Sequence, residues 1–235
     1  MRMEPDSPTR AGAADSGPPQ LAVLSRNEIE ALCARAARGA GLGWGHAEEA
    51  GFAVGWLHAQ GIDGATALLA HLDGAAGRAW RDLCPVVGPG KWVARGRHPI
   101  CPLALGAALS DHCELPEGRL AGGLSVSSAS HPVLVLPFLS RVAGILGETV
   151  RMRFFCGAID IGCDRLSGDA GRLAGLVEAA FTLSPRPGPA GAGHSHAGGY
   201  PQATLSALGD LALRTTVPPS ARSRADAGAG TGDND

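Results

Sequence analysis

The chain has 235 residues, of which 45% are hydrophobic, and a formal net charge of -2 at pH 7. These values are typical of a globular protein and unlike those of a nucleic-acid binder, because phosphate affinity needs a concentrated basic face. No run approaches the roughly 18 apolar residues of a membrane span, and residues 1–20 lack the apolar core of a secretory signal. We therefore expect a cytoplasmic protein with reduced cysteines that binds neither nucleic acid nor membrane.

The first part of the chain predicts three short amphipathic helices. Ser25 and Glu28 have the spacing of a capping box, in which each side chain accepts from the other residue's backbone N–H. Apolar residues then follow at helical spacing until the glycines at 39–43 end the first helix. Similar patterns predict a second helix over 46–60 and a third over 64–73.

The middle of the chain is less regular. Residues 91–94 predict a short strand, and residues 101–111 are apolar without a clean period, which favours a buried strand or a packed loop. Residues 131–147 are strongly apolar around Pro137. Because proline inside a helix costs about 3 kcal/mol, we expect either a strand up to Leu136 followed by a helix, or a kinked helix.

Alternating residues predict strands towards the end. Residues 149–154 and 158–161 are expected to form a hairpin, 173–183 a third strand and 203–213 a final helix. The predicted fold class is α+β. It has an N-terminal three-helix unit followed by a small, mostly antiparallel sheet with one or two further helices.

The same patterns divide the chain into segments. We expect a disordered N-terminus over 1–20 and a single α+β domain over 21–213, with a helical subdomain at 21–75. Residues 185–201 are rich in Gly, Pro and His and predict a flexible loop. Residues 214–235 form a polar tail in which serine, arginine, glycine and acidic residues fall in ordered blocks.

Signatures of common enzymes are missing: there is no G-x-S-x-G, phosphate loop, H-E-x-x-H or C-x-x-C. His98, Cys101, His112 and Cys113 are zinc-ligand types, but their spacing does not match a zinc site. We expect neither a metal nor a cofactor. Cys101 and Cys113, with His98 and His112 nearby in sequence, are weak candidates for a catalytic thiol.

The tail offers groups that suit an anion. Its hydroxyls and guanidinium groups could bind a carboxylate or phosphate, and its glycines could form an anion-cradling backbone nest. The alternative is an ordinary solvated chain end. The predicted ligand-binding residues are Arg214, Ser220, Arg222, Ser223, Arg224, Gly228, Gly230, Asp233 and Asp235.

The chain resembles an uncharacterised, mainly proteobacterial family with a domain of unknown function. Residues 27–30, 37–41 and 101–111 look similar to that family. The ending does too, through Arg214, Thr215, Val217, Pro218, Ser220, Ser223, Arg224, Gly228, Ala229, Gly230, Asp233, Asn234 and Asp235. This resemblance implies kinship and brings no assigned activity.

Three functions follow as hypotheses. The leading one is a non-catalytic or accessory protein that binds a small anionic metabolite or a partner protein. The second is an enzyme that acts on a small carboxylate through a Cys/His-based site. For this second hypothesis, the first helices are distantly similar to the helical cap of a malate/lactate dehydrogenase family, without the histidine expected at 63–65. The third is a structural subunit of a larger complex.

Overall fold

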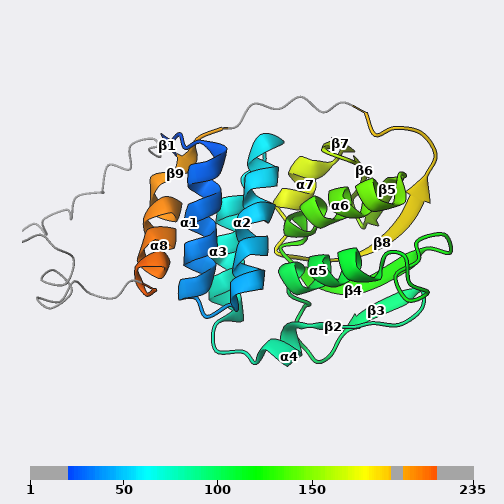
Figure 1. The fold of residues 1–235 in the computed structure, drawn as a ribbon, viewed down its shortest axis with the longest axis horizontal. Coiled ribbons are helices and arrows are strands. Elements are labelled where there is room, and N and C mark those ends of the chain that lie inside the picture. The colour runs from blue at the N-terminus through cyan, green and yellow to red at the C-terminus, as the bar shows by residue number, and fades with distance from the viewer. Residues whose placement is uncertain (1–20, 192–197, 216–235) are drawn as a thin grey trace, which may run out of the picture.

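The computed structural model describes residues 21–191 and 198–215. The predicted disordered N-terminus at 1–20, residues 192–197 of the predicted 185–201 loop, and residues 216–235 of the predicted tail lie outside the described residues. Helices gather on one side of the molecule and a sheet on the other (Figure 1).

The helical side contains the three predicted N-terminal helices and one from the far end of the chain. They are α1 (Arg26–Gly39), α2 (Trp44–Ala59), α3 (Gly64–Ala75) and α8 (Gln202–Leu213). α8 packs against α1 and α3. Beside them, β1 (Leu21–Ala22) pairs with β9 (Tyr200–Pro201), which brings the segment before α1 next to the segment before α8.

Local sequence explains where these helices begin. Both halves of the capping box are present at α1: Ser25 N donates to the Glu28 carboxylate at 2.8 Å, and Glu28 N donates to Ser25 Oγ at 3.3 Å. Asp63 caps α3, because its carboxylate accepts from Thr66 N at 3.0 Å. These bonds satisfy N–H groups that the first helical turn leaves unpaired.

The sheet has seven strands in the order β2-β3-β4-β8-β5-β6-β7, and β3–β4 is its one parallel pair. This confirms the predicted mixture of helices with a mostly antiparallel sheet. The strands are β2 (Pro85–Val86), β3 (Lys91–Ala94), β4 (Leu124–Ser130), β5 (Thr149–Phe154), β6 (Gly157–Gly162), β7 (Arg165–Gly168) and β8 (Glu178–Arg186). The predicted hairpin corresponds to β5 and β6.

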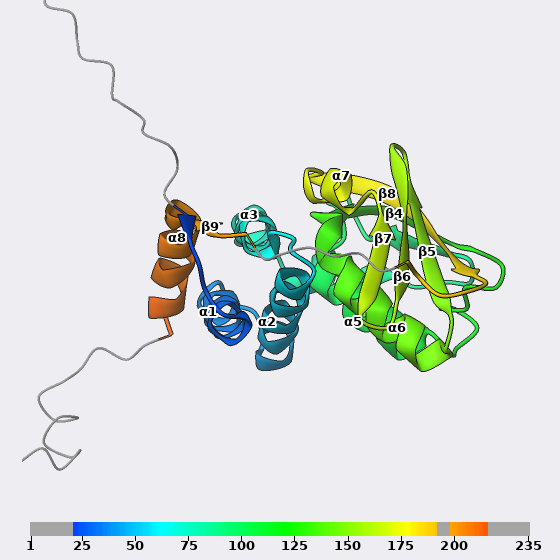
Figure 2. The same cartoon turned by 90° about the horizontal axis from the view of Figure 1, so that it is seen from above.

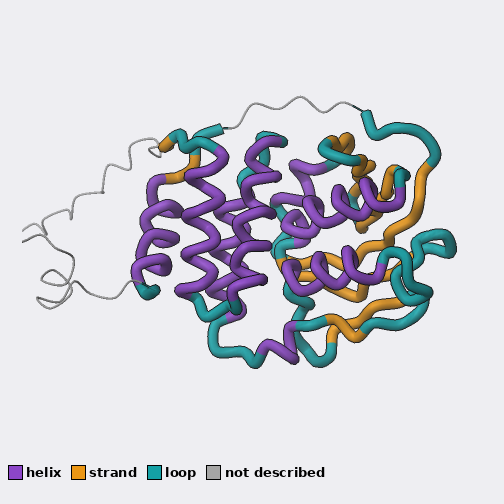
Figure 3. The backbone as a smooth tube through the Cα atoms, in the orientation of Figure 1, coloured by secondary structure: helices purple, strands orange, loops and turns teal. Residues whose placement is uncertain are grey.

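A middle layer lies between the helices and the sheet. It is formed by α5 (Pro102–His112), the 3-10 helix η1 (Pro132–Val135) and α6 (Leu136–Leu146). Figure 2 shows α5 and α6 on one face of the sheet, with α2 beyond them. The smooth tube of Figure 3 shows α1, α2, α3 and α8 side by side, and α5 and α6 beside the strands of the sheet.

The prediction of a strand or loop at 101–111 is wrong, because this segment is α5. Cys101 is its N-cap, and Pro102 occupies the first turn, where the missing N–H costs no hydrogen bond. α5 contacts both α2 and the sheet strands β2 and β4. A helix covered on two sides needs apolar residues around most of its circumference, which removes the helical period from the sequence.

Two further boundaries differ from prediction. The strand expected up to Leu136 is wrong, because η1 and α6 occupy this region and Pro137 lies in the first turn of α6. The strand expected over 173–183 begins only at Glu178 and is preceded by the short helix α7 (Ala170–Ala174). In the described part of the chain, no helix is both long and apolar enough to cross a membrane.

Candidate functional site

His71 lies in the interior of α3 and is almost fully buried, with 4% of its surface exposed. Both ring nitrogens have polar neighbours: Nδ1 lies 2.8 Å from Ser130 Oγ, and Nε2 lies 3.2 Å from Cys101 Sγ. The three residues come from α3, the last position of β4 and the N-cap of α5. We call them the His71 cluster.

Backbone bonds fix Cys101 beside Ser130. Ile100 N donates to Ser128 O, and Ser130 N donates to Ile100 O, each at 3.0 Å. Cys101 N donates to Leu83 O at 2.9 Å, which ties the N-cap of α5 to the end of α4 (Trp80–Leu83). Backbone hydrogen bonds therefore hold the end of β4 and the start of α5 side by side, which fixes the positions of Ser130 and Cys101.

A cavity of about 250 Å³ opens in front of His71 and Ser130. Its polar lining residues come from separate elements, whereas Cys101 lies behind His71 and does not line it. The lining residues are Ala70, His71, Gly74, Ala75, Arg78, Leu83, Pro99, Ser130, His131, Val177 and Glu178. We call this cavity the His71 pocket.

Burial keeps the cluster uncharged. It lowers the pKa of His71 to about 4, and the charges of His131 and Arg78 act in the same direction. Burial likewise raises the pKa of the Cys101 thiol to about 12, although the backbone N–H groups of Ala104 and Leu103 oppose this. At neutral pH the imidazole and the thiol are therefore both neutral.

The backbone next to Ser130 has an uncommon conformation. His131 has φ 40° and ψ 61°, the left-handed region that residues other than glycine rarely adopt. The bond from His131 N to Val177 O, at 2.7 Å, holds it there. Such a conformation costs about 1–3 kcal/mol and occurs more often at functional sites than elsewhere.

Glu178, which is paired with Ser130 across β4 and β8, also lines the His71 pocket. Its carboxylate accepts from Ser128 Oγ at 2.6 Å and is therefore held in place. The pocket combines one cationic side chain, Arg78, with one anionic side chain and the neutral His71 cluster. This arrangement suits a small polar ligand that has both acceptor and donor groups.

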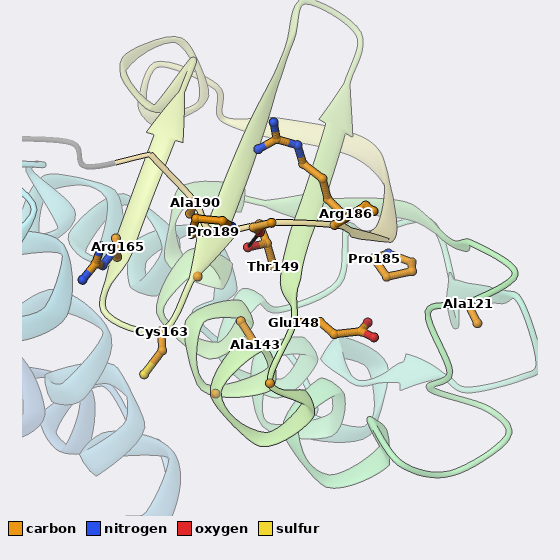
Figure 4. Close-up of a pocket in the computed structure, with 15 residues that line it drawn as sticks. Ala121, Ala143, Glu148, Thr149, Cys163, Arg165, Pro185, Arg186, Pro189 and Ala190 are labelled. Atoms are coloured by element: carbon orange, nitrogen blue, oxygen red, sulfur yellow. Dashed lines mark hydrogen bonds between the residues drawn. The ribbon is translucent and has the colours of Figure 1, made fainter.

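A larger cavity of about 880 Å³ lies at the end of the sheet. Residues 187–190 cross one side of it, held by the bond from Thr149 Oγ1 to Gly188 O at 2.7 Å. In Figure 4, Arg165, Arg186 and Glu148 point in different directions around this cavity. Its polar side chains do not converge on one point, so it is a weaker candidate for recognising a small ligand than the His71 pocket.

The structure distributes the residues singled out from the sequence. His98 is exposed, His112 Nδ1 lies 2.9 Å from Ala108 O, and Cys113 Sγ donates to Ser110 O. The histidine that contacts Cys101 is His71. Within residues 21–191 and 198–215, no three His, Cys, Asp or Glu side chains are grouped so that they could hold a metal ion.

Of the predicted ligand-binding residues in the tail, only Arg214 is described. It is exposed and forms the C-cap of α8. The others, Ser220, Arg222, Ser223, Arg224, Gly228, Gly230, Asp233 and Asp235, lie outside the described residues.

Sequence reasoning did not single out His71, Arg78 or Ser130. The one available signal was a histidine between Leu68 and Leu72 on an apolar helical face, and such a residue is usually a satisfied core histidine. Nothing in the sequence shows that this histidine meets a cysteine and a serine from two other elements.

Residues 24–101 match the model of a family described as "Protein of unknown function (DUF3726)". This confirms the resemblance to an uncharacterised family, and the matched segment includes His71, Arg78 and Cys101. No curated protein matches the chain.

Proposed function

We propose that this protein, whose residues 24–101 match a family of unknown function, binds a small carboxylate metabolite in the His71 pocket. One observation carries the proposal: Arg78, His131 and Ser130 line one small cavity around a buried, doubly hydrogen-bonded imidazole. A small anionic ligand is thus still expected, but we place its binding site in the His71 pocket and not in the polar tail.

Arg78 supplies the charge for a carboxylate. A guanidinium group has several N–H donors in a fixed plane and can donate two of them to one carboxylate. Arg78 lines the same pocket as His71 and Ser130, so its guanidinium borders the space in which the carboxylate would bind. The ring of His131 and the hydroxyl of Ser130 provide further polar contacts around that space.

Glu178 narrows the ligand class. Its carboxylate is held by Ser128 beside the paired Ser130, where it repels a second anionic group and attracts a donor. We therefore expect a carboxylate that also has a hydroxyl or ammonium group. A cavity of about 250 Å³ holds on the order of eight waters by liquid volume, which suits a metabolite of similar heavy-atom count.

Calorimetric titration with lactate, alanine and propionate tests the proposal, because these acids share a three-carbon skeleton and differ in the donor at carbon 2. We expect lactate or alanine to bind more tightly than propionate. Arg78→Ala should weaken binding by about 10-fold or more, since a charged hydrogen bond is worth about 1.5–3 kcal/mol.

Arg81→Ala is the matched control. Arg81 lies three residues away, is exposed and forms a surface pair with Asp82 at 3.6 Å. It does not line the pocket, so its replacement should leave binding unchanged. Equal binding by the wild type and Arg78→Ala, or an equal loss in both variants, would refute the site.

A further inference from the structure

We infer that the His71 pocket is catalytic: Ser130 is a nucleophile for acyl transfer, His71 is its general base, and Cys101 is a positioning residue. The inference rests on the proposed function for substrate binding and adds an activity to it. The substrate class is a small ester or thioester whose acyl group has a free carboxylate.

The geometry places a serine hydroxyl in direct contact with a buried imidazole. Ser130 Oγ is 2.8 Å from His71 Nδ1, within reach for direct proton transfer. His71 is held from behind by Cys101 Sγ at 3.2 Å, as a base in a nucleophilic site must be oriented by a third group. The serine faces the cavity while the other two members are buried.

Accessibility to the pocket decides which residue of the His71 cluster attacks the substrate. Cys101 is 1% exposed and lies outside the pocket lining, so its sulfur is closed to a substrate in the pocket. Ser130 is partly exposed and lines the pocket. The hydroxyl is therefore placed for attack, and the thiol is placed to receive the Nε2–H of the imidazole.

The chemical steps balance without a cofactor. Ser130 Oγ bonds to the acyl carbon as its proton moves to His71 Nδ1, and this proton then passes to the leaving oxygen or sulfur as the acyl bond breaks. Water attacks the resulting ester, giving one proton to Nδ1, and Ser130 Oγ recovers this proton as the carboxylic acid leaves. Throughout, the Nε2–H of His71 donates to Cys101 Sγ.

Arg78 and His131 supply the polar environment for these steps. The guanidinium would hold the free carboxylate of the acyl group, which orients the ester carbonyl towards Ser130. The left-handed turn at His131 ends β4 directly after the nucleophile and keeps the serine at the cavity wall. A carboxylate-bearing ester should therefore react faster than a neutral one.

The test uses the full chain with 4-nitrophenyl hemisuccinate and 4-nitrophenyl acetate, followed by intact mass and peptide mapping. We expect faster turnover of the hemisuccinate and an acyl adduct on Ser130. Ser130→Ala should lower kcat/KM by about 100-fold or more while retaining lactate or alanine binding through Arg78. Ser125→Ala, on the same strand but outside the pocket, should keep full activity.

Two further variants keep the test decisive if Ser130→Ala folds poorly. Ser130→Cys should still form an adduct, now a thioester at the same position. Cys101→Ala should lower kcat more than it raises KM and should shift the acidic limb of the pH–rate profile, which a purely structural role would not do.

The outcomes separate this inference from the proposed function. Binding of lactate or alanine without hydrolysis, or an adduct elsewhere than Ser130, overturns the catalytic role and leaves the binding site standing. An unchanged rate in Ser130→Ala also overturns it. If the wild type binds neither lactate nor alanine, the catalytic role and the proposed binding site are both overturned.

Discussion

The carbonyl group of Leu211 in α8 lies directly against Gly39 in α1, with no room for a Cβ atom between the two helices. Leu211 itself is buried, as is Leu208 one turn earlier. The last described helix therefore docks on the first through a backbone-to-backbone contact that only glycine permits at this position.

Gly39→Ala should push α8 away from α1. The added methyl would meet backbone atoms of Leu211, which cannot rotate aside as a side chain could. We expect a loss of about 1–3 kcal/mol in the free energy of unfolding, measured by urea denaturation. Gly209→Ala, in α8 and with nothing near its added Cβ, should instead stabilise by about 0.5–1 kcal/mol.

The stability of the protein should fall as pH falls from about 6.5 to about 4 because of His71. The folded protein holds the pKa of His71 at about 4, below its usual 6.5, so only the unfolded chain takes up a proton in this window. The loss is about 3 kcal/mol, at 1.36 kcal/mol per pKa unit.

Urea denaturation of His71→Gln at pH 7 and pH 4.5 measures this contribution. The difference between the two pH values should be smaller in His71→Gln than in the wild type. Some dependence will remain, because burial also lowers the pKa of His131. His98→Gln, at an exposed position, should keep the full difference, and an identical difference in all three proteins would contradict the assignment.

Asp160→Asn should destabilise the sheet. The Asp160 carboxylate accepts a hydrogen bond from Arg151 Nε at 2.7 Å and forms an ion pair with Arg186 Nη1, also at 2.7 Å, and its side chain is 12% exposed. Loss of this charge leaves two guanidinium groups without their anionic partner, and we expect the free energy of unfolding to fall by about 1.5–3 kcal/mol in urea denaturation. The exposed pair of Arg81 with Asp82 gives the control Asp82→Asn, which should cost at most about 0.5 kcal/mol.

The effect of Asp160→Asn should depend on pH. The hydrogen bond from Arg151, and next the charges of Arg151 and Arg186, lower the pKa of Asp160 against the opposing effect of burial. Stability from this carboxylate is therefore present above its unfolded pKa and is lost as pH falls through the lower folded value. The gap between wild type and variant should narrow in that acidic range.

Cys163 should react first with a thiol reagent such as dithiobis-nitrobenzoate. It is exposed, whereas Cys33 and Cys101 are buried and burial raises the pKa of both thiols. We expect a fast phase in the folded protein that Cys163→Ser removes. Reaction of Cys33 and Cys101 should wait for unfolding in denaturant, so rapid labelling of Cys101 in the folded state would contradict its burial.

The N-terminal helices could be predicted because their signals are local. Ser25 and Glu28 are three residues apart, and Asp63 caps the helix that directly follows it. α5 could not be predicted in the same way, because its apolar circumference reflects neighbours on two sides. Strand β4 was also missed, since its serines lack the β-branched and aromatic residues typical of strands.

The His71 cluster was missed for a different reason. Cys101 was singled out through His98 and His112, which are near it in sequence, whereas its partner His71 lies on another helix. Ser130 is further away still and joins the cluster through the pairing of β4 with the segment before α5. Contacts of this kind follow from tertiary packing, which residue spacing does not reveal.

The docking of α8 on α1 also constrains how the protein is made. During synthesis, α1 leaves the ribosome early, but Leu208 and Leu211 emerge only after the whole sheet has been translated. The α1 surface around Gly39 therefore remains uncovered for most of translation. A nascent chain stalled before α8 would present that apolar surface to chaperones and proteases, even with its sheet complete.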